Sequence, residues 1–410
     1  MCSLSRILKL SVLLPVLAFS NFSFAQKYFQ PGHIINLNGD TIKGRIYYKN
    51  WVSAPDIIKF IPENDSNEIV CSFNNIKGFE VAGEKYESAT IRTEVSGESI
   101  SNLSTVPELN FEKDTAFLQT QILGAKTLYY YQSHQGRNQY YIKIDGNFVL
   151  LIYKRYQFDN GVSALAIKEN KGYLNQLKNY FGDCASLESK LKNVKYTTQS
   201  LSAIFDEYYK CKGISKEFSI KHDKIKFETG VVTGVSFTKS GIEYLLLNSY
   251  PAVNFNISLN FSAGLYANII FPRNMGRWSI YNELLYSAYK IKSQLLNGWE
   301  GVASLSYSYL KMNNMVRYKF PVESLFMFIN AGFSNGYALK SSSLVDYASG
   351  SSEKDLGLSR KYEQGLLLGA GIIYDRFSVE ARAEIGNGMS DLINYPTPCN
   401  RMFLLLGYRF

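Results

Sequence analysis

From about residue 226 to the end of the chain, apolar and polar residues alternate in long runs. In the first run Phe227 and Val231 fall on one face, and Glu228 and Ser236 fall on the other. A period of two is typical of β-strands, whose successive side chains point to opposite sides. The pattern recurs at about 258–272, 278–291, 303–320, 325–339, 362–375, 377–390 and 401–410. The sequence therefore predicts eight strands.

The links between these strands alternate in length. Short links follow the second, fourth and sixth strands, with RNMGR at 273–277, PVES at 321–324 and DR at 375–376. The other links are longer and polar, such as residues 340–360. Bacterial outer-membrane barrels have short periplasmic turns and longer external loops, and their strands need about 9–11 residues. The pattern favours an antiparallel transmembrane β-barrel over a soluble one.

The strand at 377–390 indicates which face points inward. One side carries Phe377, Val379, Ala381, Ala383 and Ile385, and the other carries Ser378, Glu380, Arg382 and Glu384. Charges inside and apolar residues outside suit a membrane barrel, whereas a soluble barrel has the reverse. The expected lumen charges are Glu283, Lys311, Arg317, Lys319, Glu380, Arg382, Glu384 and Arg409. We expect them to form an ion-pair network that fills the barrel; the alternative is a selectivity lining.

The last ten residues, RMFLLLGYRF, form an apolar strand. Leu404, Tyr408 and Phe410 alternate on the expected lipid face, while Arg401 and Arg409 point inward. A closing strand of this kind leaves no unpaired edge in lipid. We also expect Tyr408 and Phe410 to form a C-terminal assembly signal that the barrel-insertion machinery reads.

Residues 1–25 are typical of a secretory signal peptide. Arg6 and Lys9 form a basic region, an apolar stretch follows, and Ser23 and Ala25 mark a small-residue cleavage site. Removal of Arg6 and Lys9 lowers the formal charge from +9 to +7, and the remaining charge is spread along the chain. We expect an exported protein in the outer membrane of a Gram-negative bacterium, in contact with its lipid and without a nucleic-acid partner.

Residues 26–225 predict a smaller α+β domain that is rich in strands. The segment GHIINLNGDTIKGRIYYKNW predicts a hairpin that turns at Asn38-Gly39-Asp40. More strands are predicted near 56–61 and 68–82, and residues 125–156 predict three strands joined by glycine-containing turns. The tyrosines at 129–131 and 140–141 favour cross-strand packing over an exposed stacking platform.

The end of this domain predicts two short amphipathic helices. Their apolar stripes cover positions 173–181 and 201–208, and each helix is expected to end on a cysteine, Cys184 and Cys211. In an oxidising periplasm these two cysteines favour a disulfide, with buried free thiols as the alternative. Neither has a Cys or His partner at metal-ligand spacing. Cys71, in a strand, and Cys399, in an external loop, are expected to stay unpaired.

Four stretches of the C-terminal half, YNELLYSAYK, MVRYKF, INAGF and LLLGYRF, resemble the PorT-like outer-membrane barrels of Bacteroidetes. The GDTIKG hairpin and the cysteine-bearing helices resemble, more loosely, the N-terminal regions of some barrels of that phylum. The resemblance implies the barrel architecture. One branch of the family is tied to type IX secretion, a role that the pattern alone does not carry over.

No pattern in the chain indicates catalysis. His33, His134 and His222 all precede the barrel and are far apart, and no HExxH, phosphate loop or nucleophile elbow occurs. We expect a non-enzymatic barrel without metal or cofactor. An even number of strands places both barrel ends on one side, so residues 26–225 are expected in the periplasm. There they would bind an unidentified protein in envelope organisation or secretion; the alternative is a barrel for binding or transport of a small ligand.

Overall fold

The structure is a computed structural model that divides into two units, Met1–His222 and Asp223–Phe410. It describes residues 28–158, 166–221, 223–242, 253–254, 256–294, 301–322, 324–347, 350, 352–354, 360–388 and 397–410. The expected signal peptide lies outside these ranges.

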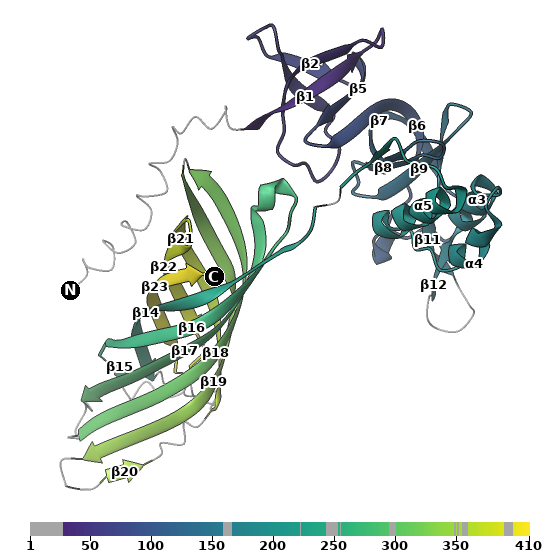
Figure 1. Cartoon of the computed structure of the whole chain (residues 1–410). Coiled ribbons are helices and arrows are strands. Elements are labelled where there is room, and N and C mark those ends of the chain that lie inside the picture. Colours follow the sequence, from purple (N-terminus) through teal and green to yellow (C-terminus); the bar gives the residue numbers. More distant parts are fainter. Residues whose placement is uncertain are drawn as a thin grey trace. The chain divides into compact units, whose positions relative to one another are not determined.

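The N-terminal unit is built on an antiparallel sheet of eleven strands in the order β10-β9-β8-β7-β6-β5-β1-β2-β3-β4, with β13 beside β7 (Figure 1). The strands are β1 (Phe29–Asn36), β2 (Thr41–Tyr47), β3 (Ile57–Pro62), β4 (Ile69–Ser72), β5 (Ile76–Val81), β6 (Glu84–Glu94), β7 (Phe111–Leu123), β8 (Leu128–Gln132), β9 (Asn138–Ile144), β10 (Asn147–Leu150) and β13 (Phe218–Ser219). A second sheet pairs β11 (Lys154–Phe158) with β12 (Ala166–Asn170). The predicted hairpin is β1–β2, and Gly39 in its turn has a φ of 98°, which glycine adopts readily. The three strands predicted within 125–156 are β8, β9 and β10.

Three helices pack together against the sheet: α3 (Gly172–Tyr180), α4 (Glu188–Leu191) and α5 (Thr198–Lys212) (Figure 1). The side chain of Thr197 accepts a hydrogen bond from the Ser200 N–H and so caps the start of α5. Gly213, with a φ of 65°, ends the helix. The predicted stripe of α5 is buried against Leu128 and Ile142 of the sheet. The helices therefore form a layer on one face of the sheet.

A disulfide joins Cys184 to Cys211, as the sequence predicted, with the two Cα atoms 6.5 Å apart. One detail of the prediction was wrong. Cys184 does not end a helix, because α3 stops at Tyr180 and the chain turns before the short helix η3 (Ala185–Leu187) begins. The bond thus ties the turn after α3 to the last turn of α5.

The tyrosines of β8 and β9 pack inside the unit, and the exposed stacking platform is excluded. Tyr129 lies opposite Tyr141 across the ladder, and neither side chain has any exposed surface. Burial raises the pKa of both phenols, so the hydroxyls stay protonated and donate hydrogen bonds. Tyr129 donates to Glu87, and Tyr141 donates to the Arg92 carbonyl. These residues therefore have a structural role.

The C-terminal unit is a closed ring of eight long antiparallel strands (Figure 1). The strands are β14 (Lys226–Ile242), β16 (Ser258–Ile270), β17 (Trp278–Gln294), β18 (Gly301–Val322), β19 (Leu325–Tyr347), β21 (Tyr362–Tyr374), β22 (Phe377–Gly386) and β23 (Cys399–Arg409). Two short strands, β15 (Val253–Asn254) and β20 (Ser352–Lys354), pair with β14 and β19. The ring closes where β23 pairs with β14. The predicted number of strands and their antiparallel order are confirmed.

The ring is staggered, as closure of a barrel requires. One circuit of directly opposite residues runs through Gly230, Tyr266, Glu283, Asn313, Ser334, Gly365, Gly386 and Cys399 to Ser240. The circuit therefore returns to β14 ten positions beyond its start at Gly230. The strands consequently tilt, and the start of β14 and the end of β23 lie at the same rim, where the short turns are.

Several strand boundaries differ from the prediction, for example β17, which ends at Gln294 instead of residue 291, and β18, which spans Gly301–Val322 instead of 303–320. Residues 340–347 were expected in a loop but continue β19, because the start of β18 pairs with them up to Tyr347. Strand β22 stops at Gly386 instead of residue 390. Cys399 begins β23 and is fully buried, so its placement in an external loop was wrong. The polar composition of residues 340–347 led to the prediction of a loop there, but a strand that extends beyond the lipid layer needs no apolar face.

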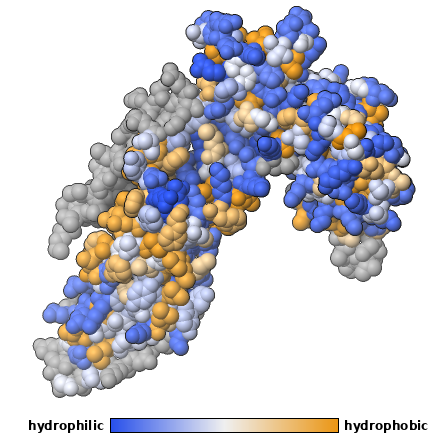
Figure 2. All heavy atoms as spheres, viewed as in Figure 1, coloured by the Kyte–Doolittle hydropathy of each residue, from blue (hydrophilic) through white to orange (hydrophobic). Residues whose placement is uncertain are grey.

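The two faces of the barrel are those that the alternation predicted. Phe377 and Ile385 point outward with 62% and 66% of their surface exposed, while Arg382 and Glu384 on the same strand are 1% exposed. Figure 2 shows hydrophobic residues along the outer face of the barrel that is in view. The apolar exterior suits lipid, and the charges line the lumen.

The disulfide gives a first prediction. The Cys184→Ser/Cys211→Ser double variant should lower the stability of the helical part of the N-terminal unit by about 2–4 kcal/mol, because the bond closes a loop of 27 residues. Urea unfolding of the full chain, followed by the circular dichroism of the helices, measures the loss. Cys71→Ser is the matched control, because this buried thiol is free. An unchanged helical transition in the double variant would contradict the prediction.

Candidate functional site

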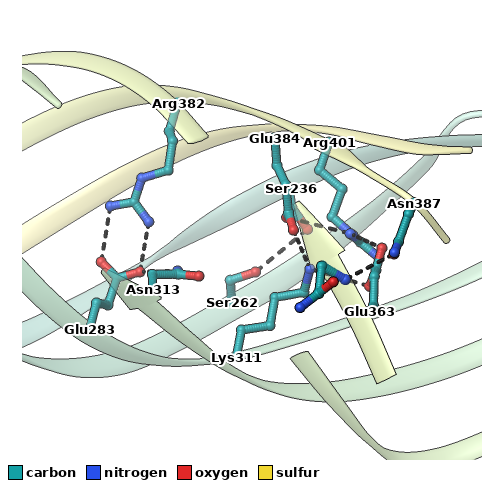
Figure 3. Close-up of polar contacts among 11 residues, drawn as sticks. Ser236, Ser262, Glu283, Lys311, Asn313, Glu363, Arg382, Glu384, Asn387 and Arg401 are labelled. Carbon is teal, nitrogen blue, oxygen red and sulfur yellow. Dashed lines mark hydrogen bonds and ion pairs between the residues drawn. The ribbon is translucent and has the colours of Figure 1, made fainter. Parts of the chain in front are cut away.

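The charges at the centre of the lumen form a compact group, named here the middle cluster: Glu283, Arg317, Glu380 and Arg382. Arg382 of β22 reaches across the lumen to Glu283 of β17, with Nη1–Oε1 and Nη2–Oε2 distances of 2.6 and 3.0 Å (Figure 3). Its Nε also donates to Glu380 Oε1 at 2.6 Å. Arg317 of β18 lies 3.4 Å from the other oxygen of Glu380. Paired contacts of this kind are among the strongest polar contacts in proteins.

A second group, the distal cluster, lies farther from the short turns and consists of Lys311, Glu363, Glu384 and Arg401. Arg401 of β23 binds both oxygens of Glu363 on β21, at 2.7 and 2.9 Å (Figure 3). Lys311 of β18 lies 2.6 Å from Glu384 and 3.3 Å from Glu363. All four side chains are at most 1% exposed. The cluster joins strands from both halves of the ring.

Aromatic rings occupy space beside the charges. The guanidinium of Arg317 lies 3.8 Å from the centre of the Tyr281 ring and 4.1 Å from that of Phe328. Tyr289, Tyr307 and Tyr309 stack on one another near Arg401. A guanidinium stacked on a ring is held by cation–π attraction as well as by packing. Side chains thus fill the middle of the lumen, as is usual for a barrel of eight strands.

The structure separates the eight predicted lumen charges into two sets. Six are buried in the two clusters: Glu283, Lys311, Arg317, Glu380, Arg382 and Glu384. Lys319 and Arg409 lie at the short-turn rim and are partly exposed. There Arg409 pairs with Glu228 at 2.6 Å.

Glu363 was not predicted as a member of the network, and Arg401 was predicted on the inner face without a partner. Alternation marks both residues as inward-facing. They pair over the intervening strand β22, and alternation does not give the stagger that brings them together.

No catalytic arrangement is found among the described residues. His33 lies on β1, 3.9 Å from Glu80, and His134 lies in the turn between β8 and β9. His222 is outside the described ranges. Within those ranges, no group of His, Cys, Asp or Glu side chains is arranged to hold a metal ion. In the same part of the chain, no helix is long and apolar enough to span a membrane.

One family model and several solved structures are similar to the C-terminal half of the chain. Residues 217–394 match the family model described as outer membrane protein beta-barrel domain. Solved structures that resemble this part of the chain include Ail, the attachment invasion locus protein of Yersinia pestis, with 15% sequence identity and a TM-score of 0.25. The match covers 45% of this chain and 99% of the Ail chain.

OprG of Pseudomonas aeruginosa is also similar, with 11% identity and a TM-score of 0.29, covering 45% of this chain and 97% of its own. Neisserial surface protein A has 11% sequence identity and a TM-score of 0.25, and the match covers 46% of this chain and 100% of the Neisserial chain. A comparison with curated proteins found no match.

The middle cluster gives a second prediction. Glu283→Gln should destabilise the barrel by about 3–5 kcal/mol, because Arg382 keeps its buried charge but loses its main partner. Arg409→Gln is the control, since its partly exposed pair with Glu228 should be worth about 0–1 kcal/mol. Urea unfolding in detergent micelles, read as the fraction of compact, unheated protein on a gel, measures both. Equal losses in the two variants would contradict the prediction.

Proposed function

Because the C-terminal half is a barrel of the outer-membrane type, we propose that it is a non-enzymatic anchor that holds the N-terminal unit in the periplasm. There the N-terminal unit binds a protein partner in envelope organisation or secretion. The observation that carries this proposal is the filled middle of the lumen, where the two buried charge clusters occupy the space that a passing solute would need. The same proposal includes kinship with the PorT-like barrels of Bacteroidetes and insertion by the barrel-assembly machinery. It also includes the absence of catalysis and of any cofactor.

The positions of the two ends of the barrel support the proposal that the N-terminal unit lies on the periplasmic side of the membrane. Strand β14 starts and β23 ends at the rim that carries the short links, which join β16 to β17, β18 to β19 and β21 to β22. In outer-membrane barrels the short turns face the periplasm. The chain that leads into Lys226 from the N-terminal unit would therefore lie on the periplasmic side.

The N-terminal unit offers a surface suited to a partner. Strand β4 ends the sheet order, and Ile57 on β3 and Val70 on β4 lie on the same face of the sheet and are 58% and 52% exposed. Apolar side chains gathered at a sheet edge commonly mark an interaction surface or are shielded by one. This surface supports a binding role for the unit.

A third prediction concerns the partner. A protein cross-linked to the full chain in intact cells should be lost when residues 26–225 are removed behind the signal peptide, while the barrel still inserts. Val70→Lys should weaken the cross-link, because it places a charge on the apolar edge. Ile144→Lys is the matched control, because it makes the same change at an exposed apolar residue of β9, near the other end of the sheet order. Cross-linking that survives the deletion would refute the anchoring role.

A fourth prediction separates the anchor from the alternative, a barrel that transports a small solute. The full chain in a planar bilayer should show no steady ion current, because the two clusters fill the lumen. The Glu283→Ala/Arg382→Ala variant removes two long side chains from the centre without changing the net charge, and should raise the frequency of current steps. Steady conductance by the unaltered protein would favour the transport alternative.

A further inference from the structure

The lumen is hollow on the short-turn side of the middle cluster. A cavity of about 530 Å³, named here the rim cavity, opens at this rim. Arg317 forms its inner end, where its Nε donates to Asn330 at 2.8 Å and its Nη2 contacts Glu380. The rim cavity is therefore a blind pocket, which would hold a solute rather than pass it.

Among the described residues that line the rim cavity, positive charges outnumber negative ones. These residues include four basic side chains, Arg317, Lys319, Arg376 and Arg409, and two acidic ones, Glu228 and Asp375. A concave site with one dominant sign of charge concentrates ions of the opposite sign. The complementary ligand is negatively charged.

The ammonium of Lys319 has no ion-pair partner among the described residues around it. Both oxygens of Glu228 are occupied, one by Arg409 at 2.6 Å and the other by Asn268 at 3.1 Å. Among the described residues, no carboxylate oxygen lies within 4.0 Å of the Lys319 ammonium. Its nearest recorded contact is the face of the Phe326 ring, 5.8 Å from Nζ to the ring centre. A partly buried ammonium without an ion-pair partner is a suitable donor to an incoming anion.

We propose that the rim cavity binds a small oxyanion, a phosphate or carboxylate group, between Lys319 and Arg376. Lys319 supplies a charge from the wall, and Arg376 supplies one from the exposed turn between β21 and β22. The Ser378 hydroxyl on the same wall adds a further donor. Two aromatic residues of the lining, Tyr266 and Phe326, would contact the body of a larger anion. The proposal rests on the proposed orientation only in assigning the cavity to the periplasmic side.

The test is calorimetric titration of the folded, detergent-solubilised full chain at low ionic strength, with inorganic phosphate in one arm and succinate in the other. We expect saturable binding that weakens as salt is added, and a loss of at least about tenfold in affinity in Lys319→Gln. Lys340→Gln is the matched control, because it makes the same charge change on β18's partner β19 at the opposite end of the barrel. Its affinity should equal that of the unaltered protein.

Arg376→Gln provides a second variant in an exposed turn, where the substitution does not disturb the ladder. A heat-dependent gel shift checks that each variant is folded. Competition by phosphatidylglycerol in mixed micelles would assign the bound anion to a lipid headgroup, and no competition would assign it to a soluble solute. Absence of binding in both arms, or unchanged affinity in both Lys319→Gln and Arg376→Gln, would overturn the proposal. Neither result would alter the cross-linking or conductance outcomes, which test the anchoring role separately.

Discussion

In a hydrocarbon layer each backbone N–H or C=O without a hydrogen-bond partner costs several kcal/mol, so a sheet can cross it only as a closed ring. The pairing of β23 with β14 meets that requirement, and the rest of the barrel follows from it. Closure imposes the stagger that carries Gly230 to Ser240 in one circuit. Stagger and the period of two together decide which side chain meets which across the lumen.

Closure around a narrow lumen then sets a second requirement, because charges withdrawn from water must be paired. Each cluster contains two acidic and two basic side chains, so each is neutral as a unit. In the middle cluster Glu283 and Arg382 come from positions 99 residues apart, and only the closed ring brings them together. The network is thus a consequence of the ring and also a constraint on it, since a slip of one residue in register would turn these charges toward lipid.

The barrel could be predicted from the sequence because its two signals, alternation and link length, are local. Its network could not be predicted in full, since the partner of Arg401 depends on the stagger of β21 relative to β23, with β22 between them. In the N-terminal unit, β7 escaped prediction for a different reason. Its residues from Ala116 to Ile122 are buried on both faces, so the strand shows no alternation. It also carries buried Gln119 and Gln121, whose side-chain amides donate hydrogen bonds to Tyr86 and to Gln119, contacts that only the fold provides.

The distribution of charge along the lumen separates structure from function. Where the side chains are most deeply buried, the charges balance and every carboxylate is held by a cation on another strand. At the short-turn rim the balance ends among the residues that the structure describes, because Glu228 pairs with Arg409 and Lys319 has no described carboxylate within 4.0 Å. An unbalanced charge is tolerated there because water reaches the rim, whereas in either cluster it would cost several kcal/mol. The rim is therefore the part of the lumen where a charged ligand can replace water without breaking an ion pair on which the ring depends.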